Sequence, residues 1–412
     1  MTGNKLVSVL MPVYHDVKFL RQSIDSILCQ TYKNTELLLL VSRNSDDGSA
    51  VICEEYADRY HNVRILTQKN TGISDALNLG IAASSGDYIA RMDADDIALP
   101  ERLEKQVRFL DGHQEVDVVG SAVMRIDEKG RQIGKVEMYT EDEDIKATLI
   151  FGNGFFHPTV MFRSRVFQGR CRYQNVLVED ARLWMDLSFD YKFANLPEVL
   201  LLYRKHPNSI TAKRAEEIVL SRAESAYNFV QKKLEWELGK YCVQDFVRTG
   251  SEERIEETME DFLSRQAELL KDLTARNQQC NAFAQNALRR ECEMRQKWLS
   301  RILSGKKLLE MKKNVVIYGY GMRGKKIIEK LKVLNERMAI HWNLCAVIDK
   351  RAPYMQKEEL PLKEPVELLA IREQVDLILV SSQIYDKEIT EELCEMGIEK
   401  SKIISCDWIF HL

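Results

Sequence analysis

The sequence predicts an α/β fold, and three observations support this fold class. Over residues 1–210, short β-rich runs alternate with segments in which apolar residues have helical spacing. Residues 313–412 resume the same alternation after a proline-free stretch. The chain has 412 residues, of which 45% are hydrophobic, so it is long and apolar enough for two or three domains with buried cores.

Alternation of strands and helices in the first region predicts βαβ units and a parallel sheet. The expected strands are residues 5–13, 36–41 and 62–68, and a fourth strand with its exit covers residues 87–96. Helices are expected at residues 18–30, 51–60, 73–84 and 101–113, the last directly after Pro100. In the C-terminal region, a strand, a glycine turn and a helix are expected over residues 313–331, with further strands at 344–351 and 375–382.

Composition divides the chain into three parts: an α/β domain at residues 1–210, a helical linker or subdomain at 211–312, and a small α/β domain at 313–412. The middle part has no proline and only three glycines, but no clean heptad, so a long coiled coil is not expected. Its apolar residues, such as Phe229, Val230 and Trp236, are too many to leave in water. We expect them to cover the first domain or to form a homo-oligomer contact.

Charge and cysteine content exclude several classes of protein. A net charge of −4 and a pI near 6.1 provide no broad basic field, so nucleic acid is not expected as a partner. The nine cysteines form no Cys-x-x-Cys pair and no zinc pattern, which indicates reduced thiols. The N-terminus lacks the plan of a signal peptide, and no run of 18 apolar residues occurs. The expected location is therefore cytoplasmic, with a peripheral membrane contact left open.

Three aspartates follow the fourth expected strand, in the stretch ARMDADDIALPERL. Like charges this close repel unless a positive charge lies among them. Residues i and i+2 of an extended chain point to the same side, so Asp93 and Asp95 can converge on one ion at the carboxyl end of a parallel sheet. Carboxylates are hard ligands that suit Mg²⁺ or Mn²⁺. The alternative is an acidic cap for the helix at residue 101, a role that suits Asp96.

Four motifs, in order along the chain, carry a family resemblance: VSVLMPVYHD, NTGISDALNLGIAASSGDYIARMDADD, HPTVMFRSRVF and VEDARLWMDL. Together they resemble the family 2 glycosyltransferases over residues 5–210. The resemblance implies the GT-A fold and an inverting transfer of a sugar from a nucleotide donor. It also implies a divalent metal, Mn²⁺ or Mg²⁺, that bridges the donor diphosphate.

The resemblance implies roles for residues on the donor side of the site. The end of the first strand would line the nucleotide pocket, the first aspartate of the acidic turn would meet the sugar and ribose, and the second would bind the metal. Related enzymes often carry a histidine that reaches the metal, and a nearby arginine suits a phosphate clamp. The residues in question are Pro12, Val13, Tyr14, Asp93, Asp95, His206 and Arg204.

On the acceptor side, the acidic pair Glu179–Asp180 matches the pair of the family. By the resemblance, Asp180 is the general base that takes the proton of the acceptor hydroxyl as that hydroxyl attacks the anomeric carbon. From the residues alone, the favoured role of Asp180 is that of an acid at the N-terminus of a helix. His206 could likewise be a solvated loop histidine. His157 is expected to shape the acceptor-side loop, and Trp184 to pack in the core.

One feature departs from the family. Relatives usually end their second strand with one or two aspartates, and an acidic side chain there can accept the N3–H of uracil. Here the strand ends in Ser42-Arg43, and aspartates occur only at positions 46 and 47. Arg43 would suit a base with an acceptor at that place, such as cytosine. The expected donor is therefore a UDP-sugar, with a CDP-linked donor as the alternative.

The C-terminal region contains a second motif, Gly319-Tyr320-Gly321-Met322-Arg323-Gly324 after a strand, with Asp349 at the end of the next strand. This context is typical of a dinucleotide fingerprint, since glycines allow close approach of phosphates to a helix N-terminus. It resembles small Rossmann-like modules found beside sugar-modifying enzymes, so an accessory nucleotide-binding or assembly role is expected.

The sequence thus predicts a metal-dependent inverting glycosyltransferase. Its expected partners are a nucleoside diphosphate sugar and a carbohydrate or lipid-linked acceptor in the synthesis of surface polysaccharide or glycolipid. Two alternatives come from other classes. One is an NAD(P)-linked oxidoreductase that uses the C-terminal domain, although no Tyr-x-x-x-Lys is found after residue 349. The other is a non-catalytic carbohydrate-binding or scaffold protein, against which the intact aspartates 93, 95 and 180 argue.

Overall fold

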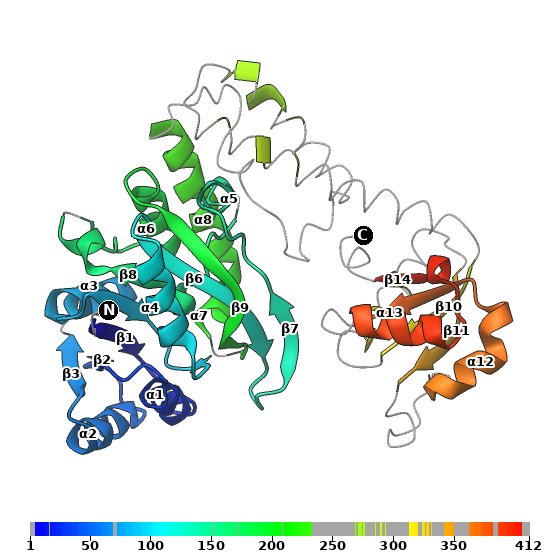
Figure 1. Cartoon of the computed structure of the whole chain (residues 1–412), viewed down its shortest axis with the longest axis horizontal. Coiled ribbons are helices and arrows are strands. Elements are labelled where there is room, and N and C mark those ends of the chain that lie inside the picture. The colour runs from blue at the N-terminus through cyan, green and yellow to red at the C-terminus, as the bar shows by residue number, and fades with distance from the viewer. Residues whose placement is uncertain are drawn as a thin grey trace. The chain divides into compact units, whose positions relative to one another are not determined.

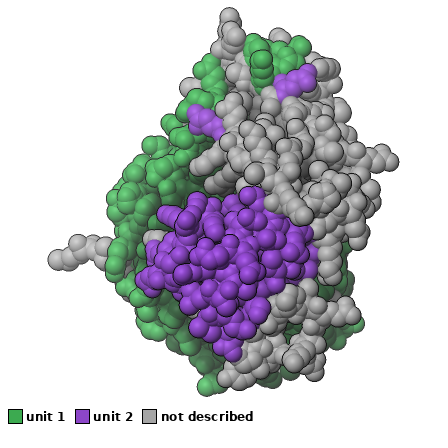
Figure 2. All heavy atoms as spheres, turned by 90° about the vertical axis from the view of Figure 1, so that its right-hand side faces the viewer, with its two compact units in different colours: residues 1–252, 269–292 green, residues 253–268, 293–412 purple. Residues whose placement is uncertain are grey.

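A computed structural model describes residues 5–15, 17–68, 72–150, 152–169, 171–207, 209–232, 313–319, 342–349, 362–381 and 386–405, with isolated positions between 268 and 331. The chain forms two compact units (Figure 2). The first comprises residues 1–252 and 269–292, and the second comprises residues 253–268 and 293–412.

The first unit is built on a nine-stranded sheet whose N-terminal half is parallel (Figure 1). Its order is β3-β2-β1-β4, and each neighbouring pair is parallel. The expected strands and helices are present as β1 (Val7–Val13), α1 (Leu20–Leu28), β2 (Thr35–Ser42), α2 (Ser49–Arg59), β3 (Val63–Gln68), α3 (Ile73–Ala83), β4 (Tyr88–Arg91) and α4 (Arg102–Gly112).

Successive side chains of each strand point to opposite faces of the sheet, so they enter two different hydrophobic cores. On one face, Leu38 and Leu40 of β2 pack with α3. On the other, Leu37 and Leu39 pack with α1, α2 and α4. Both sheet faces are therefore buried, which explains why β2 reads as an uninterrupted run of leucines.

The remaining strands make the sheet mixed, which corrects the expectation of a purely parallel sheet. The order continues from β4 as β8-β6-β9-β5, with β7 paired to β6. Strand β8 is antiparallel to both of its neighbours, whereas β6 and β9 are parallel. The additional elements are β5 (Ile97–Ala98), β6 (Val118–Ile126), β7 (Gln132–Val136), α5 (Asp142–Thr148), β8 (Met161–Arg163), α6 (Glu179–Leu187), β9 (Phe193–Arg204) and α7 (Ile210–Lys213), with 3₁₀ turns at His157–Thr159 and Ser164–Phe167.

The start of the predicted helical region packs on the first unit. Helix α8 (Ala215–Lys232) buries Ala226, Phe229 and Val230 in the same core as Trp184 of α6. These apolar side chains therefore cover the first unit, although they lie beyond residue 210. Trp236 lies outside the described residues. None of the described helices has both the length and the apolar character needed to cross a bilayer.

The second unit contains a five-stranded parallel sheet (Figure 1). Its order is β12-β11-β10-β13-β14, so the chain order of the strands reverses between β10 and β13. A reversal at this place is the switch point of a doubly wound, Rossmann-like sheet. The elements are β10 (Lys313–Tyr318), β11 (Trp342–Ile348), β12 (Leu362–Lys363), α12 (Leu368–Ile371), β13 (Leu377–Val380), α13 (Asp386–Glu395) and β14 (Ile403–Ser405), with 3₁₀ turns at Pro365–Glu367, Arg372–Gln374 and Lys400–Lys402.

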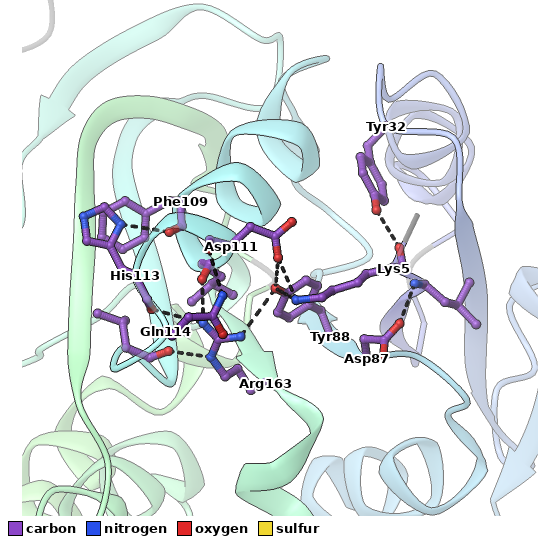
Figure 3. Close-up of polar contacts among 12 residues, drawn as sticks. Lys5, Tyr32, Asp87, Tyr88, Phe109, Asp111, His113, Gln114 and Arg163 are labelled. Atoms are coloured by element: carbon purple, nitrogen blue, oxygen red, sulfur yellow. Dashed lines mark hydrogen bonds and ion pairs between the residues drawn. The ribbon is translucent and has the colours of Figure 1, made fainter. Parts of the chain in front are cut away.

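A polar cluster closes the amino end of the parallel strands in the first unit (Figure 3). Lys5 Nζ lies 2.7 Å from Asp111 Oδ1, and the Tyr88 hydroxyl donates to the same oxygen at 2.6 Å. Burial acts to raise the pKa of Asp111, but the bonds from Lys5 and Tyr88 outweigh it and hold that pKa below its usual range. The cluster ties the start of β1 to the end of α4.

We expect Asp111→Asn to lower the free energy of unfolding at pH 7 by about 1.5–3 kcal/mol, the usual range for a hydrogen bond to a charged group. Because the folded-state pKa is depressed, this contribution is present above the unfolded pKa and is lost as pH falls through the folded pKa, below about pH 4. Urea unfolding at pH 7 and pH 3 measures it. The exposed pair Lys135–Glu137 supplies a control, since Glu137→Gln should change stability by less than about 1 kcal/mol. An Asp111→Asn effect that is equal at both pH values would contradict the assignment.

Candidate active site

The acidic turn leaves the sheet at the carboxyl end of β4. Met92 and Ala94 are buried in the core, and the main-chain nitrogen of Met92 still donates to Leu10 of β1 at 3.0 Å. The alternate residues, Asp93 and Asp95, consequently point to the opposite side and are only partly buried. The spacing of two residues thus presents both carboxylates on one side of the chain, as predicted.

Three carboxylates and one imidazole come together at this turn. Asp93, Asp95 and Asp96 each offer an oxygen, and these oxygens lie within 4.8 Å of one another. His206 Nε2, from the loop after β9, lies 2.9 Å from Asp95 Oδ2. The imidazole is therefore not a solvated loop side chain, since only 10% of it is exposed.

Three buried arginines supply the positive charge that the acidic turn requires. Arg91 Nη2 contacts Asp93 Oδ1 directly. Arg102, which is 0% exposed, donates to the main-chain carbonyl of Arg91 at 2.7 Å, and its burial lowers its pKa to about 9. Arg204 donates from Nε to the carbonyl of Asp95 at 2.7 Å. Both the side chains and the main chain of the turn are thus held by guanidinium groups.

Asp96 is the anchor of the turn and not a helix cap. Helix α4 begins after Glu101 with no side-chain cap, whereas Asp96 Oδ1 accepts from the main-chain nitrogen of Arg204 at 2.7 Å. Its Oδ2 is buried and has no hydrogen-bond partner among the described residues. Burial, followed by the charges of Asp93 and Asp95, raises the pKa of Asp96 well above its usual range.

The turn suits a divalent cation. Burial also raises the pKa of Asp93, and the charge of Asp95 adds to this effect while Arg91 opposes it. Concentrated carboxylate charge in a low-dielectric site is stabilised by a cation, and oxygen donors with one imidazole suit Mn²⁺ or Mg²⁺. The residues present therefore fit the implied metal, with Asp93, Asp95 and His206 as its candidate ligands.

Arg204 is placed differently from a phosphate clamp. Its side chain is buried, with Nη2 donating to Gln22 Oε1 at 2.6 Å and the guanidinium 4.3 Å from the ring centre of Phe19. Its donors are engaged by protein acceptors, so this geometry gives Arg204 the role of holding the acidic turn. A direct bond from Arg204 to a donor phosphate stays an untested prediction.

The acidic pair opens helix α6, and its two members differ. Glu179 is buried, and this burial, with the charge of Asp180, raises its pKa to about 8. Asp180 is partly exposed, and its Oδ1 accepts from the main-chain nitrogen of Ala181 at 2.7 Å. The charge of Asp180 contributes to the raised pKa of Asp93, and the charge of Asp93 contributes to the raised pKa of Glu179. The acidic turn and the acidic pair therefore belong to one electrostatic site.

The predicted nucleotide-pocket residues lie at the adjoining ends of β1 and β2. Val13 is 1% exposed and packs in the core, so its side chain cannot line a pocket, whereas Pro12 is partly exposed and Tyr14 is 54% exposed. Arg43 is exposed directly after β2. The loops that follow these strands are joined, because the main-chain nitrogen of Val17 donates to Asp47 Oδ2 at 3.1 Å. Asp47 therefore organises the loops.

In the second unit, the glycine turn lies where the strand order reverses. Gly319 follows β10 with φ +99°, a conformation that favours glycine, and the Ser381 hydroxyl after β13 donates to its carbonyl at 2.8 Å. A Cβ on Gly324 would collide with the carbonyl oxygen of Gly319. Asp349 is buried at the end of β11, and Gly321 lies outside the described residues.

Several residues of the site were not found from the sequence. Arg91 and Arg102 look like ordinary surface charges of a strand end and a first helical turn, and only their tertiary contacts mark them. Tyr173 stands in a loop with no motif, yet its hydroxyl lies 2.8 Å from His157 Nε2. The one available signal was the position of these arginines directly beside a cluster of aspartates.

Two family models match parts of the chain. The family model described as glycosyl transferase family 2 matches residues 8–170, and one described as C2185-like, N-terminal, matches residues 311–404. The O-antigen biosynthesis glycosyltransferase WbnJ of Escherichia coli is 34% identical over 234 residues, which are 55% of this chain and 90% of that one. The amylovoran biosynthesis glycosyltransferase AmsE of Erwinia amylovora is 31% identical over 223 residues, 53% of this chain and 84% of that one.

Among solved structures, S. aureus TarS 1-349 in complex with UDP-GlcNAc is similar with a TM-score of 0.47 at 15% identity, covering 73% of this chain and 92% of that one. The family assignment rests on the sequence matches, since WbnJ is 34% identical and is covered over 90% of its length. The match to the family model, residues 8–170, includes the acidic turn. The N-terminal part of this chain is thus a GT-A enzyme domain, and the protein belongs to glycosyltransferase family 2.

Proposed function

We propose that the first unit transfers a sugar from a nucleoside diphosphate donor to a hydroxyl acceptor, with inversion and with a divalent cation. The observation that carries this proposal is the acidic triad within 4.8 Å, adjacent to the charge of Asp180 at the carboxyl end of the central strands. In open α/β sheets this edge is where ligands bind.

Asp95 and His206 would hold the cation, with Asp93 beside them, and Arg91 keeps Asp93 oriented. The cation, when bound, offsets the negative charge that grows on the leaving diphosphate. Asp93 would also accept hydrogen bonds from sugar and ribose hydroxyls. The chain thus combines ligands for the metal with an acceptor for the sugar in one turn.

Asp180 is the proposed general base. The acceptor oxygen forms a bond to the anomeric carbon as the bond from that carbon to the diphosphate oxygen breaks, and the hydroxyl proton passes to the Asp180 carboxylate. Glu179 is less suited to this task at neutral pH, because a pKa of about 8 leaves it mostly protonated. The pair therefore consists of a buried Glu179 and a partly exposed Asp180.

The donor is proposed to be a UDP-sugar, with a CDP-linked donor as the alternative. Arg43 stands at the end of β2, where an acid would accept from uracil, and its exposure leaves it able to meet a base. A thermal-shift panel of UDP, CDP and GDP with and without Mn²⁺ tests this choice. A stabilisation by UDP or CDP only when Mn²⁺ is present supports the proposal, and a stabilisation by GDP alone, or the absence of any Mn²⁺-dependent shift, contradicts it.

The acceptor is proposed to be a growing surface polysaccharide or glycolipid. Relatives that this chain resembles are named for O-antigen and amylovoran biosynthesis, which are syntheses of such polymers. The second unit is proposed to be an accessory nucleotide-binding or assembly module, because the described acidic and metal-ligating residues of the site all come from the first unit.

If the second unit is an accessory module, Gly324→Ala in the full chain should destabilise that unit without lowering transfer activity. The added methyl meets a main-chain oxygen that cannot move aside, so we expect the second unit to lose a few kcal/mol of stability. Donor hydrolysis or transfer should stay within about twofold of the unmodified protein. Gly112→Ala is the control, since its methyl finds no atom within 4 Å. Loss of transfer, with nucleotide binding intact, would instead place the second unit in the catalytic machinery.

A further inference from the structure

A buried polar pair lies behind the acidic pair in the first unit. His157, in the 3₁₀ turn His157–Thr159, and Tyr173, in the loop before α6, are 7% and 4% exposed. His157 Nε2 and the Tyr173 hydroxyl share a hydrogen bond of 2.8 Å. The other ring nitrogen, Nδ1, lies 3.7 Å from Glu179 Oε1.

The imidazole is fixed from two sides. Its ring packs edge-on against Trp184 at 5.7 Å and tilted against the ring of Tyr173 at 5.4 Å. Trp184 belongs to α6, so the imidazole contacts the same helix that presents the acidic pair. Burial, with the charge of Arg91, lowers the pKa of His157 well below its usual range, so the ring is neutral.

Tyr173 is itself held by helix α3. Asn78 binds it with both ends of its amide, because Oδ1 accepts from the Tyr173 nitrogen at 3.0 Å and Nδ2 donates to the Tyr173 carbonyl at 2.8 Å. The Ser74 hydroxyl donates to the carbonyl of Gln174 at 2.8 Å. The loop before α6 is therefore attached to α3, which packs on β1, β2 and β3.

We infer that Tyr173 and His157 are positioning residues for the acidic pair, linking Asn78 of α3 through the tyrosine hydroxyl and the imidazole to Glu179. Glu179 and Asp180 are consecutive in the first turn of α6, so packing of the imidazole against Glu179, at 3.7 Å and thus beyond a hydrogen bond, also affects the direction of the Asp180 carboxylate. The inference rests on the proposed function, because it concerns the base of that reaction.

If Tyr173 and His157 served only to stabilise the fold, the expected result of substitution would be different. A buried hydroxyl and imidazole gain little net stability over apolar side chains of the same shape, because both must first give up their bonds to water. Phenylalanine in place of Tyr173 keeps the ring within its hydrophobic core and removes only the oxygen. If the pair served packing alone, Tyr173→Phe would leave the kinetics of transfer unchanged.

The test is Tyr173→Phe in the full chain, with Tyr191→Phe as the matched control. Tyr191 packs against the same core and loses only a 3.4 Å bond to the carbonyl of Val166. For Tyr173→Phe we expect kcat to fall by about ten- to a hundredfold, as for a modest misplacement of a catalytic group. The dissociation constant of the donor nucleotide with Mn²⁺, measured by calorimetry, should stay within about twofold of that of the unmodified protein.

A double-mutant cycle separates action through Glu179 from an independent effect. If Tyr173 acts through Glu179, adding Tyr173→Phe to Glu179→Gln should lower kcat much less than it does alone, since the contact is already altered. Additive losses would overturn the inference, as would a Tyr173→Phe variant indistinguishable from Tyr191→Phe. If Tyr173→Phe fails to fold, His157→Gln, which keeps a polar atom towards Tyr173, undergoes the same measurements with the same deciding outcomes.

Failure of this inference is distinguishable from failure of the proposed function. An unmodified protein that transfers sugar, together with an unaffected Tyr173→Phe, removes only the positioning role. An unmodified protein that neither transfers nor hydrolyses any nucleotide sugar in the panel overturns both.

Discussion

Replacing Asp180 with asparagine is expected to lower kcat by at least about a hundredfold, because general-base assistance contributes about 10²–10⁴. Donor affinity should change little, since Asp180 lies on α6 and the proposed metal ligands lie on the acidic turn and the loop after β9. Steady-state kinetics with saturating donor measure kcat, and calorimetry with nucleotide and Mn²⁺ measures the affinity.

Asp190→Asn controls for the loss of a negative charge near the same helix, because Asp190 is exposed beyond the end of α6. It should leave both parameters unchanged. An Asp180→Asn variant with near-normal transfer would move the base role elsewhere. Glu179 would then be the first candidate, and its pKa of about 8 would place the rise of activity at alkaline pH.

Replacing Asp95 with asparagine is expected to remove metal-dependent donor binding while leaving the fold intact. A neutral amide is a poor substitute for a carboxylate on a hard cation. It also gives His206 Nε2 a weaker partner in place of the oxygen at 2.9 Å. Because loss of even an outer contact typically lowers metal affinity about 10- to 100-fold, we expect the Mn²⁺-dependent nucleotide affinity to fall by about a hundredfold or more.

The control for Asp95→Asn is Asp58→Asn, an exposed aspartate on α2. Thermal unfolding without metal should be nearly the same for both variants. This is expected because the turn is anchored chiefly by Asp96 and by the main-chain carbonyl of Asp95, which the substitution retains. Unchanged Mn²⁺-dependent affinity in Asp95→Asn would mean that the acidic turn is a purely structural feature.

The strands and helices of the parallel half of the first unit could be predicted from the local spacing of apolar residues. Helix α1 and strand β2 follow from the spacing of apolar residues along a few turns or a few extended residues, and both lie within one or two residues of the predicted bounds. The same reasoning named none of the later strands of this sheet, neither the long β6 and β9 nor the short β5 and β8. For β5 and β8, of two and three residues, the reason is length, because a strand that short contains no readable alternation. Their pairing depends on strands far away in the sequence.

The sequence by itself determined the class of the fold, the family and the acidic turn, because each depends on neighbouring residues. Tertiary structure alone decided how the charges of the turn are balanced and which member of the acidic pair is buried. Arg204 lies more than a hundred positions from Asp96 along the chain, yet it provides the hydrogen bond that anchors that carboxylate. Burial raises the pKa of Glu179, and that burial comes from the packing of α6 against residues of other elements, whereas the adjacent Asp180 stays partly exposed.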